Sequence, residues 1–305
     1  MLSHLLVRAS DSPTLDRVVT GNRLARRISA RFIAGESVAD GLAAAADSAQ
    51  LGRTATLDYV GEKVTEVAAA KQAAEVYRAC LDGIAAQDLP SGISVKTSQL
   101  AINAEPEVCA DLLREIAAAA DTIGAHVTLD MEDSSTTEST VALVETLQRE
   151  GHHHVGCAVQ TYLHRTEADV ARLSEAGASI RVCKGAYAEP PTVAFQDKAA
   201  VDAAYARVTT YLLEHGTYPR FATHDERLIA HAIAEADRFG RTRQDYEFQM
   251  LYGVREELQA ELVRAGYTVC VYVPFGDNWF AYFMRRLAER PANLLFFARA
   301  LVRRT

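Results

Sequence analysis

The chain has 305 residues, and its 32 Lys and Arg against 40 Asp and Glu give a formal net charge of −8 with histidine neutral. With 49% hydrophobic and 24% charged residues, the composition excludes a disordered or collagen-like chain. The negative balance argues against broad binding of phosphate backbones, so we expect no nucleic-acid partner. This length fits either two domains or a single α/β barrel.

The spacing of the cysteines and the length of the apolar runs indicate in which cellular compartment the protein is expected. No two of the five cysteines are spaced as C-x-x-C, so we expect neither a disulfide framework nor a zinc knuckle, and a reducing, cytoplasmic compartment. Residues 1–8 become charged too soon for a signal peptide, and runs such as 294–298 are too short to span a membrane. Peripheral contact with the inner membrane stays open, and the oligomeric state is undefined.

The first fifty residues have helical periodicity. Apolar residues recur at helical spacing over residues 17–33, and the alanine-rich stretch 38–49 predicts a second helix. No linker rich in Pro, Gly or Ser follows. We therefore expect residues 1–53 to form an N-terminal helical cap on a domain that spans residues 54–305.

From about residue 54, short apolar runs alternate with helical patterns. The eight candidate strands are Ala55–Asp58, Ile93–Lys96, Val127–Asp130, Gly156–Gln160, Ile180–Cys183, Arg220–Ala222, Glu247–Met250 and Val269–Val273. Eight near-continuous apolar strands, each followed by a helix, predict an α/β fold of the TIM-like (β/α)8 barrel type. No G-x-G-x-x-G occurs in the chain, which disfavours two doubly wound halves.

Polar residues gather at the ends of these strands, where barrel enzymes place their active sites. They are Lys96, Asp130, Gln160, Lys184, Thr223, His224 and Gln249, with Tyr272 inside the last strand. Lys96 and Asp130 end neighbouring strands. The lysine could anchor an anion or form a Schiff base there, and an ion pair at the rim is the structural alternative.

The segment 181–187 follows the fifth strand. Strand alternation puts Arg181 and Cys183 on one face, and Gly185 allows a close approach of the backbone to a ligand. Lys184 offers a cation to an anionic group. An ordinary turn after a strand accounts for the pattern equally well.

Two histidine-containing segments have different expected roles. Thr223, His224 and Asp225 offer a hydroxyl, an imidazole and a carboxylate after the sixth strand, and Asp225 also suits the N-cap of the next helix. His152–His154 precede the fourth strand, at the opposite end of the barrel. Consecutive residues cannot all converge on one ion, so we expect a solvated loop and no metal site.

The C-terminal segment carries the most specific pattern. After Pro274 and Gly276, a helix is expected from about residue 278, with Tyr282, Arg285, Arg286 and Glu289 on one face. Two adjacent arginines there could grip a carboxylate through charge-assisted hydrogen bonds. An exposed face with an Arg285–Glu289 ion pair is the alternative.

Taken together, these segments resemble the proline dehydrogenase family of FAD-dependent barrels, in its short monofunctional form. The matching pieces are Ser94–Lys96, Leu129–Glu132, Val159–Tyr162, Arg181–Tyr187, Ala222–His224, Phe248–Gly253 and Tyr272–Glu289. They follow the family order over about 200 residues. The pattern Tyr-x-x-Arg-Arg-x-x-Glu is specific when it follows a strand that ends in Pro and Gly.

The resemblance implies oxidation of L-proline to Δ1-pyrroline-5-carboxylate, the first step of proline catabolism, with electrons passed from FAD to a quinone. It implies that Arg285, Arg286 and Lys96 bind the proline carboxylate and that Tyr272, Tyr282 and Leu251 pack on its ring. Asp130 and Glu289 would lie near the amine or hold the cations. Arg181, Asp130 and Tyr272 would be catalytic, with Arg181 nearest the flavin N5.

For the cofactor, the resemblance implies an FAD site formed by Asp130, Met131, Gln160, Arg181, Cys183, Lys184, Gly185, Ala186, Tyr187, Thr223, His224 and Gln249. Three residues depart from the family pattern: Cys183 where an apolar residue is expected, Ala188 where an aromatic is common, and Asp225 where Asn is common. These departures bear on local contacts with FAD.

Two other functions compete with this hypothesis. One is a Schiff-base aldolase that uses Lys96 or Lys184, and the other is a non-catalytic barrel that only binds a ligand.

Overall fold

A closed barrel of eight parallel strands forms the centre of the molecule. The computed structural model describes residues 19–20, 26 and 28–289, without the side chains of 287–289. The strands are β1 Thr54–Tyr59, β2 Ser91–Lys96, β3 Val127–Asp130, β4 Val155–Gln160, β5 Ile180–Cys183, β6 Arg220–Ala222, β7 Glu247–Leu251 and β8 Thr268–Phe275. Each pairs with its neighbours in chain order, and β8 closes on β1. The predicted barrel is confirmed; β3, β5 and β6 have the predicted bounds, and the other strands are longer by one to three residues.

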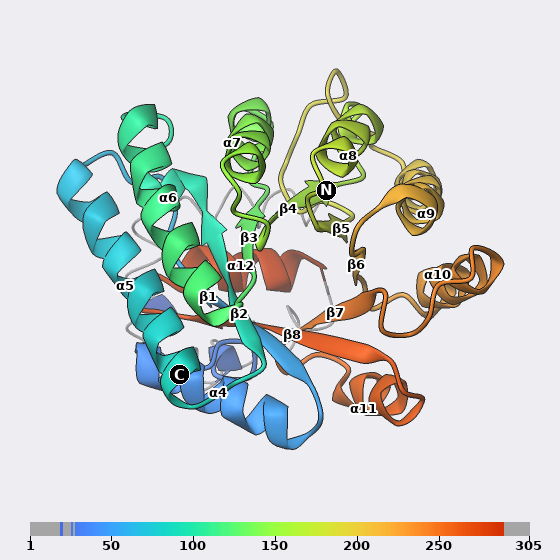
Figure 1. Ribbon diagram of the computed structural model, residues 1–305, viewed down its shortest axis with the longest axis horizontal. Helices are drawn as coiled ribbons and strands as arrows, with labels where there is room; N and C mark the ends of the chain where they lie inside the picture. The colour runs from blue at the N-terminus through green and yellow to red at the C-terminus, as the bar shows by residue number, and fades with distance from the viewer. Residues whose placement is uncertain (1–18, 21–25, 27, 290–305) are drawn as a thin grey trace, which may run out of the picture.

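Helices surround this barrel. They are α4 Val38–Gln50, α5 Val67–Ala86, α6 Pro106–Ile123, α7 Thr137–Arg149, α8 Thr166–Glu175, α9 Lys198–His215, α10 Glu226–Arg238, α11 Glu256–Arg264 and α12 Phe280–Glu289, with a short 3-10 helix, η1, at Thr97–Leu100. Figure 1 shows α4 to α11 as a ring around the strands. Every residue of β3 and β4 is buried, as strands covered on both faces require.

Two glycines allow the strands to approach their neighbours at the N-terminal end of the barrel. A Cβ atom on Gly92 would lie 2.3 Å from the carbonyl oxygen of His126, and a Cβ atom on Gly156 would lie 2.3 Å from that of Ser179. Both distances are shorter than van der Waals contact. A side chain at either position would therefore displace the backbone that leads into the neighbouring strand.

The helix α4 packs against β1 and β8, and so covers the seam where the barrel closes. It has nearly the predicted bounds and begins with a capping box: the Ser37 side chain accepts from the backbone of Asp40, and the Asp40 carboxylate accepts from the backbone of Ser37. Of the helix predicted over residues 17–33, the structure describes residues 19–20, 26 and 28–33. Residues 19–20, 26 and 28–29 are helical, as predicted, and residues 30–32 form a turn.

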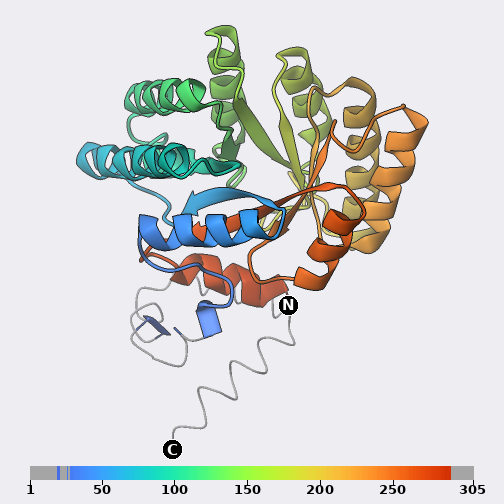
Figure 2. The same ribbon diagram turned by 60° about the horizontal axis from the view of Figure 1, so that its bottom comes forward.

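The last helix of the described chain, α12, leaves the ring. It begins at Phe280, two residues later than expected, and crosses the middle of the ring in Figure 1. In Figure 2 it lies beyond one end of the strands. Trp279, Phe280 and Phe283 are buried in a small apolar cluster with Ile33 and Val60, which anchors the start of the helix. The consequence is that the other face of α12 lies over the C-terminal ends of the strands.

Ser37→Ala should destabilise the protein by about 1 kcal/mol, because the first turn of α4 loses its side-chain cap over the barrel seam. The measurement is the midpoint of urea unfolding. Ser37→Thr, which keeps the hydroxyl, is the matched control and should stay within about 0.5 kcal/mol of the wild type. Equal midpoints for the Ala variant and the wild type would show that the cap does not contribute.

Candidate active site

The C-terminal ends of the strands and α12 enclose a cavity of about 440 Å³. The predicted site residues on its wall are Lys96, Asp130, Met131, Gln160, Arg181, Cys183, Lys184, Gly185, Ala186, Tyr187, Thr223, His224, Gln249, Leu251, Tyr272, Tyr282, Arg285 and Arg286. The structure therefore brings together every predicted site residue whose side chain it describes. Glu289 ends α12, and its side chain lies outside the described residues.

Lys96, at the end of β2, lies between two carboxylates. Its Nζ forms an ion pair with Asp58 at the end of β1, and it lies 3.6 Å from Asp130 Oδ2 at the end of β3. All three residues are buried, and Asp58 is completely so. Burial alone lowers the pKa of the Lys96 ammonium, but the two carboxylates more than offset it, so that the pKa lies above its ordinary value. The two carboxylates therefore favour the charged form of Lys96 in this buried position.

Arg181, on β5, is held on three sides. Its Nη1 donates to Asp130 Oδ1 at 2.5 Å, its Nε donates to Gln249 Oε1 at 2.5 Å, and its Nη2 donates to Ser94 Oγ at 2.9 Å. The Tyr272 hydroxyl donates to the other oxygen of Asp130 at 2.6 Å, and the Arg181 guanidinium lies 5.3 Å from the centre of the Tyr272 ring. The guanidinium thus has one defined position at the floor of the cavity.

The two arginines of α12 lie on the opposite wall. Arg285 pairs with Glu62, in the loop after β1, at 2.5 Å, and its guanidinium lies 5.5 Å from the centre of the Tyr187 ring. The Arg286 guanidinium lies 5.1 Å from the centre of the Tyr282 ring. Arg285 is buried. The ion pair ties α12 to the strand end on which Asp58 lies.

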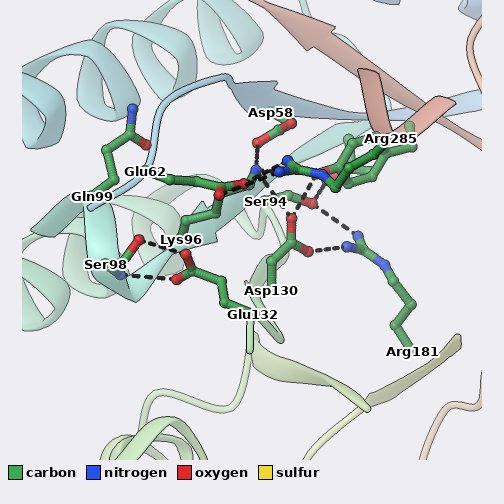
Figure 3. Close-up of polar contacts among 12 residues, drawn as sticks. Asp58, Glu62, Ser94, Lys96, Ser98, Gln99, Asp130, Glu132, Arg181 and Arg285 are labelled. Carbon is green, nitrogen blue, oxygen red and sulfur yellow. Dashed lines mark hydrogen bonds and ion pairs between the residues drawn. The ribbon is translucent and has the colours of Figure 1, made fainter. Parts of the chain in front are cut away.

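Glu132, two residues after the end of β3, connects this region to η1. Its carboxylate accepts from Ser98 N at 2.9 Å and from Ser98 Oγ at 2.5 Å, and Ser98 Oγ also accepts from the backbone of Lys63, beside Glu62. Figure 3 shows Glu132 and Ser98 next to Lys96, Glu62 and Asp130. Burial raises the pKa of Glu132 to about 7, although Ser98 donates to the carboxylate.

The loop after β5 forms another wall, and its shape depends on Gly185. This residue has φ of 119°, and a Cβ atom there would lie 2.2 Å from the Tyr162 ring. Gln160 holds the same loop: its Nε2 donates to the carbonyl of Glu132 at 2.7 Å, and its Oε1 accepts from the backbone of Ala186 at 3.3 Å. At position 185, glycine is thus required both for the positive φ of the backbone and for the close approach to the Tyr162 ring.

Lys184 and the segment after β6 complete the cavity. Lys184 Nζ lies 2.6 Å from Asp202 and 3.4 Å from Asp225, so its charge is already paired within the protein. Asp225 is the N-cap of α10, as predicted, and its side chain also lines the cavity. His224 Nε2 accepts a hydrogen bond from the backbone N–H of Leu251 at 3.1 Å, which leaves the ring proton on Nδ1.

Three acidic residues at this mouth were not predicted as site residues. Asp58 ends the first predicted strand, so the rule that assigned Lys96 and Asp130 would have assigned it too. Glu132 lies inside a matched segment but was given no role. Glu62 lies in a loop, 223 residues from Arg285 in the sequence, and no local signal connects them.

The triple histidine lies at the N-terminal end of β4, away from the cavity. His152 Nδ1 lies 2.7 Å from Asp121 Oδ2, and the carbonyl of His154 accepts from the backbone of Val127 at the start of β3. Among residues 19–20, 26 and 28–286, no three His, Cys, Asp or Glu side chains converge as metal ligands. None of the described helices is long and apolar enough to cross a bilayer.

A barrel of this kind, with a charged cavity at the C-terminal ends of its strands, is the architecture of a (β/α)8-barrel enzyme. The family model described as proline dehydrogenase matches residues 42–299. Proline dehydrogenase 1 of Bacillus subtilis (strain 168) is 35% identical over the full length of both chains. Proline dehydrogenase of Deinococcus radiodurans is 37% identical, covering 90% of this chain and 89% of the relative.

A solved structure agrees with the sequence relatives. Proline utilization A (PutA) from Bdellovibrio bacteriovorus, inactivated by N-propargylglycine, aligns with a TM-score of 0.80 at 26% identity. The alignment covers 86% of this chain and 32% of that one. The chain belongs to the proline dehydrogenase family, and its function is that of an oxidoreductase acting on proline.

Glu132→Gln should change how stability depends on pH. Because the pKa of Glu132 is raised to about 7 in the folded state from an ordinary 4.5, its stabilising contribution is complete below about pH 4.5 and is lost as the pH rises through 7. The free energy of unfolding of the wild type, relative to the Gln variant, should fall by up to about 3 kcal/mol over this range. Urea unfolding at a series of pH values measures the difference.

The control is Glu138→Gln, an exposed carboxylate whose pKa is lowered mainly by its hydrogen bond from Arg165. The wild type should gain stability relative to this variant as the pH rises through the unfolded pKa, which is the opposite sign. Parallel pH profiles for the wild type and the Glu132 variant would contradict the raised pKa.

Proposed function

We propose that this chain oxidises L-proline to Δ1-pyrroline-5-carboxylate with FAD bound in the cavity at the mouth of the barrel. The observation that carries this proposal is the arrangement of Arg285 and Arg286 on α12 across one cavity from Arg181 on β5. Two adjacent cations suit a carboxylate, and a third at the floor suits a cofactor that becomes electron-rich on reduction.

The groups on the cavity wall fit such a cofactor. Hydrogen-bonding side chains line it from four consecutive strands and the segments after them: Gln160, Arg181, Thr223, His224 and Gln249. The glycine at 185 lets backbone pass where a side chain would not fit. In our proposal these residues, with Asp130, Met131 and the 183–187 loop, hold FAD. When bound, FAD supplies the acceptor for the hydride taken from the carbon beside the proline nitrogen.

The chain's own residues bind and orient the substrate. Arg285, Arg286 and Lys96 would hold its carboxylate, which aims the reacting carbon and reduces the entropic part of the barrier. Tyr272, Tyr282 and Leu251 would form the wall against the ring, where one methylene more or less is worth about 1–3 kcal/mol.

The acidic residues would hold the cationic groups of this site in place. Asp130 accepts from both Arg181 and Tyr272, so it would hold these two groups in place while facing the amine. Glu289 would add a further negative charge near the cations of α12.

We propose a quinone as the final electron acceptor. A cytoplasmic enzyme that reduces a quinone must approach the membrane surface transiently.

A Schiff-base aldolase is disfavoured by the acidic surroundings of the two lysines. Lys96 lies between Asp58 and Asp130, which raise its pKa against the effect of burial, and Lys184 lies within 3.4 Å of two carboxylates. A nucleophilic lysine needs a neutral amine at working pH, and hence a lowered pKa. A barrel that only binds ligands would not require the buried hydrogen-bond network that fixes the position of Arg181.

The purified protein should be yellow, and L-proline should bleach its visible absorption under anaerobic conditions. An absorption spectrum before and after the addition measures this, with D-proline as the control that should leave the spectrum unchanged. A colourless protein that stays colourless after incubation with FAD and gel filtration would refute the assignment of the cofactor.

Arg286→Ala should raise the KM for L-proline by roughly 10- to 100-fold, since charge-assisted hydrogen bonds are each worth about 1.5–3 kcal/mol. The melting temperature should change by less than about 2 °C, because Arg286 is only half-buried on a helix face. Arg286→Lys, which keeps the charge but not the forked donor group, should give an intermediate KM. A loss of stability in proportion to the loss of activity would instead indicate a structural arginine.

A further inference from the structure

Below the floor of the active-site cavity, toward the N-terminal end of the barrel, lies a second layer of buried charge. Arg220 on β6 and Glu247 on β7 are only 3% and 8% exposed, with Arg220 Nε 3.7 Å from Glu247 Oε1. Arg220 Nη1 donates to Thr128 Oγ1 at 3.0 Å, and the Tyr218 hydroxyl donates to Glu247 Oε2 at 3.4 Å. Tyr218, Arg220 and Glu247 line a cavity of about 520 Å³ that opens at the end opposite to α12.

Gln249 connects this layer to the active site. It is 2% exposed and lines both cavities. Its Nε2 donates to Glu247 Oε1 at 2.5 Å, and its Oε1 accepts from Arg181 Nε at 2.5 Å. A primary amide has a donor end and an acceptor end of nearly the same shape, and a rotation of 180° about the last torsion exchanges them.

The Glu247 carboxylate removes this ambiguity. An ionised carboxylate can only accept hydrogen bonds, so the amide must turn its NH2 group toward Glu247 and its oxygen toward Arg181. With no acceptor at Glu247, the buried NH2 group of Gln249 would lose this partner, and the amide would no longer be held against rotation away from the Arg181 Nε–H. Arg181 would then lose one of its three hydrogen-bonding side chains and its defined position beside Asp130.

We propose that Glu247 is a positioning residue for Arg181, acting through the orientation of the Gln249 amide. The role of Arg181 in this statement rests on the proposed function, in which Arg181 contacts the cofactor. The atom that matters is the acceptor at the Oε1 position. The negative charge of Glu247 serves to pair Arg220 and is not needed to orient the amide.

Two conservative variants separate the acceptor from the charge. Glu247→Asp keeps the charge next to Arg220 but withdraws the acceptor from Gln249 by one methylene. Glu247→Gln removes the charge but keeps an amide oxygen that can occupy the Oε1 position, where Gln249 Nε2 donates and Arg220 Nε lies 3.7 Å away. A residue needed only for its charge or for stability would be harmed more by Gln than by Asp, and our proposal requires the opposite order.

The first readout is hydrogen exchange of the Arg181 Nε–H in the purified protein by NMR, the signal being identified by its loss in Arg181→Lys. The second is the division of activity between kcat and KM for L-proline. Glu247→Asp should raise the exchange rate and lower kcat each by about tenfold, with KM changed less than about twofold. Glu247→Gln should leave all three within about twofold of the wild type.

Tyr218→Phe, which removes the contact to the other oxygen of Glu247, is the matched control and should resemble the wild type in both readouts. The proposal is overturned if Glu247→Asp behaves like the wild type, or if Glu247→Gln is impaired as much as Glu247→Asp. If the wild type binds no flavin and does not oxidise proline, the proposed function fails, whereas the exchange rates still decide whether Glu247 orients Gln249.

Discussion

The Asp130 carboxylate is the acceptor around which the mouth of the barrel is organised. It accepts from Arg181 on β5 and from Tyr272 on β8, and it lies 3.6 Å from the ammonium of Lys96 on β2. A buried cation without an anion would cost several kcal/mol, so each of these charges is tolerated only because another strand brings its counter-charge within reach. The site therefore requires the closed barrel, because its charge partners come from different strands.

The same requirement applies to the rest of the charged interior. The buried cations Lys96, Arg181, Arg220 and Arg285 lie beside the acidic residues Asp58, Asp130, Glu247 and Glu62, respectively. The Arg285–Glu62 pair does more than neutralise charge, because it ties α12 to the loop after β1. That contact keeps the helix over the strand ends and leaves the adjacent Arg286 facing the cavity. The barrel interior and its mouth thus hold their charges in pairs.

Layers of charge inside the barrel also connect its two ends. Gln249 joins the Arg181 layer to the Arg220–Glu247 layer, and Ser94 and Thr128 supply further hydrogen bonds to the two arginines. Successive side chains along a strand alternate between the barrel interior and the helix layer, which is why polar groups two residues apart on β7 lie above one another. Residues far from any substrate can in this way define the position of a group at the mouth.

The sequence alone determined the barrel, the order of its strands and most of the residues at its mouth, because apolar periodicity and strand-end chemistry are properties of short segments. It also pointed to the two arginines on one face of the last described helix. Only the tertiary structure decided the pairing of those residues. Arg285 pairs with Glu62, 223 residues away in the sequence, and Lys96 pairs across 38 residues with Asp58. Such contacts depend on which strand ends the closed barrel places side by side, and no local pattern records that.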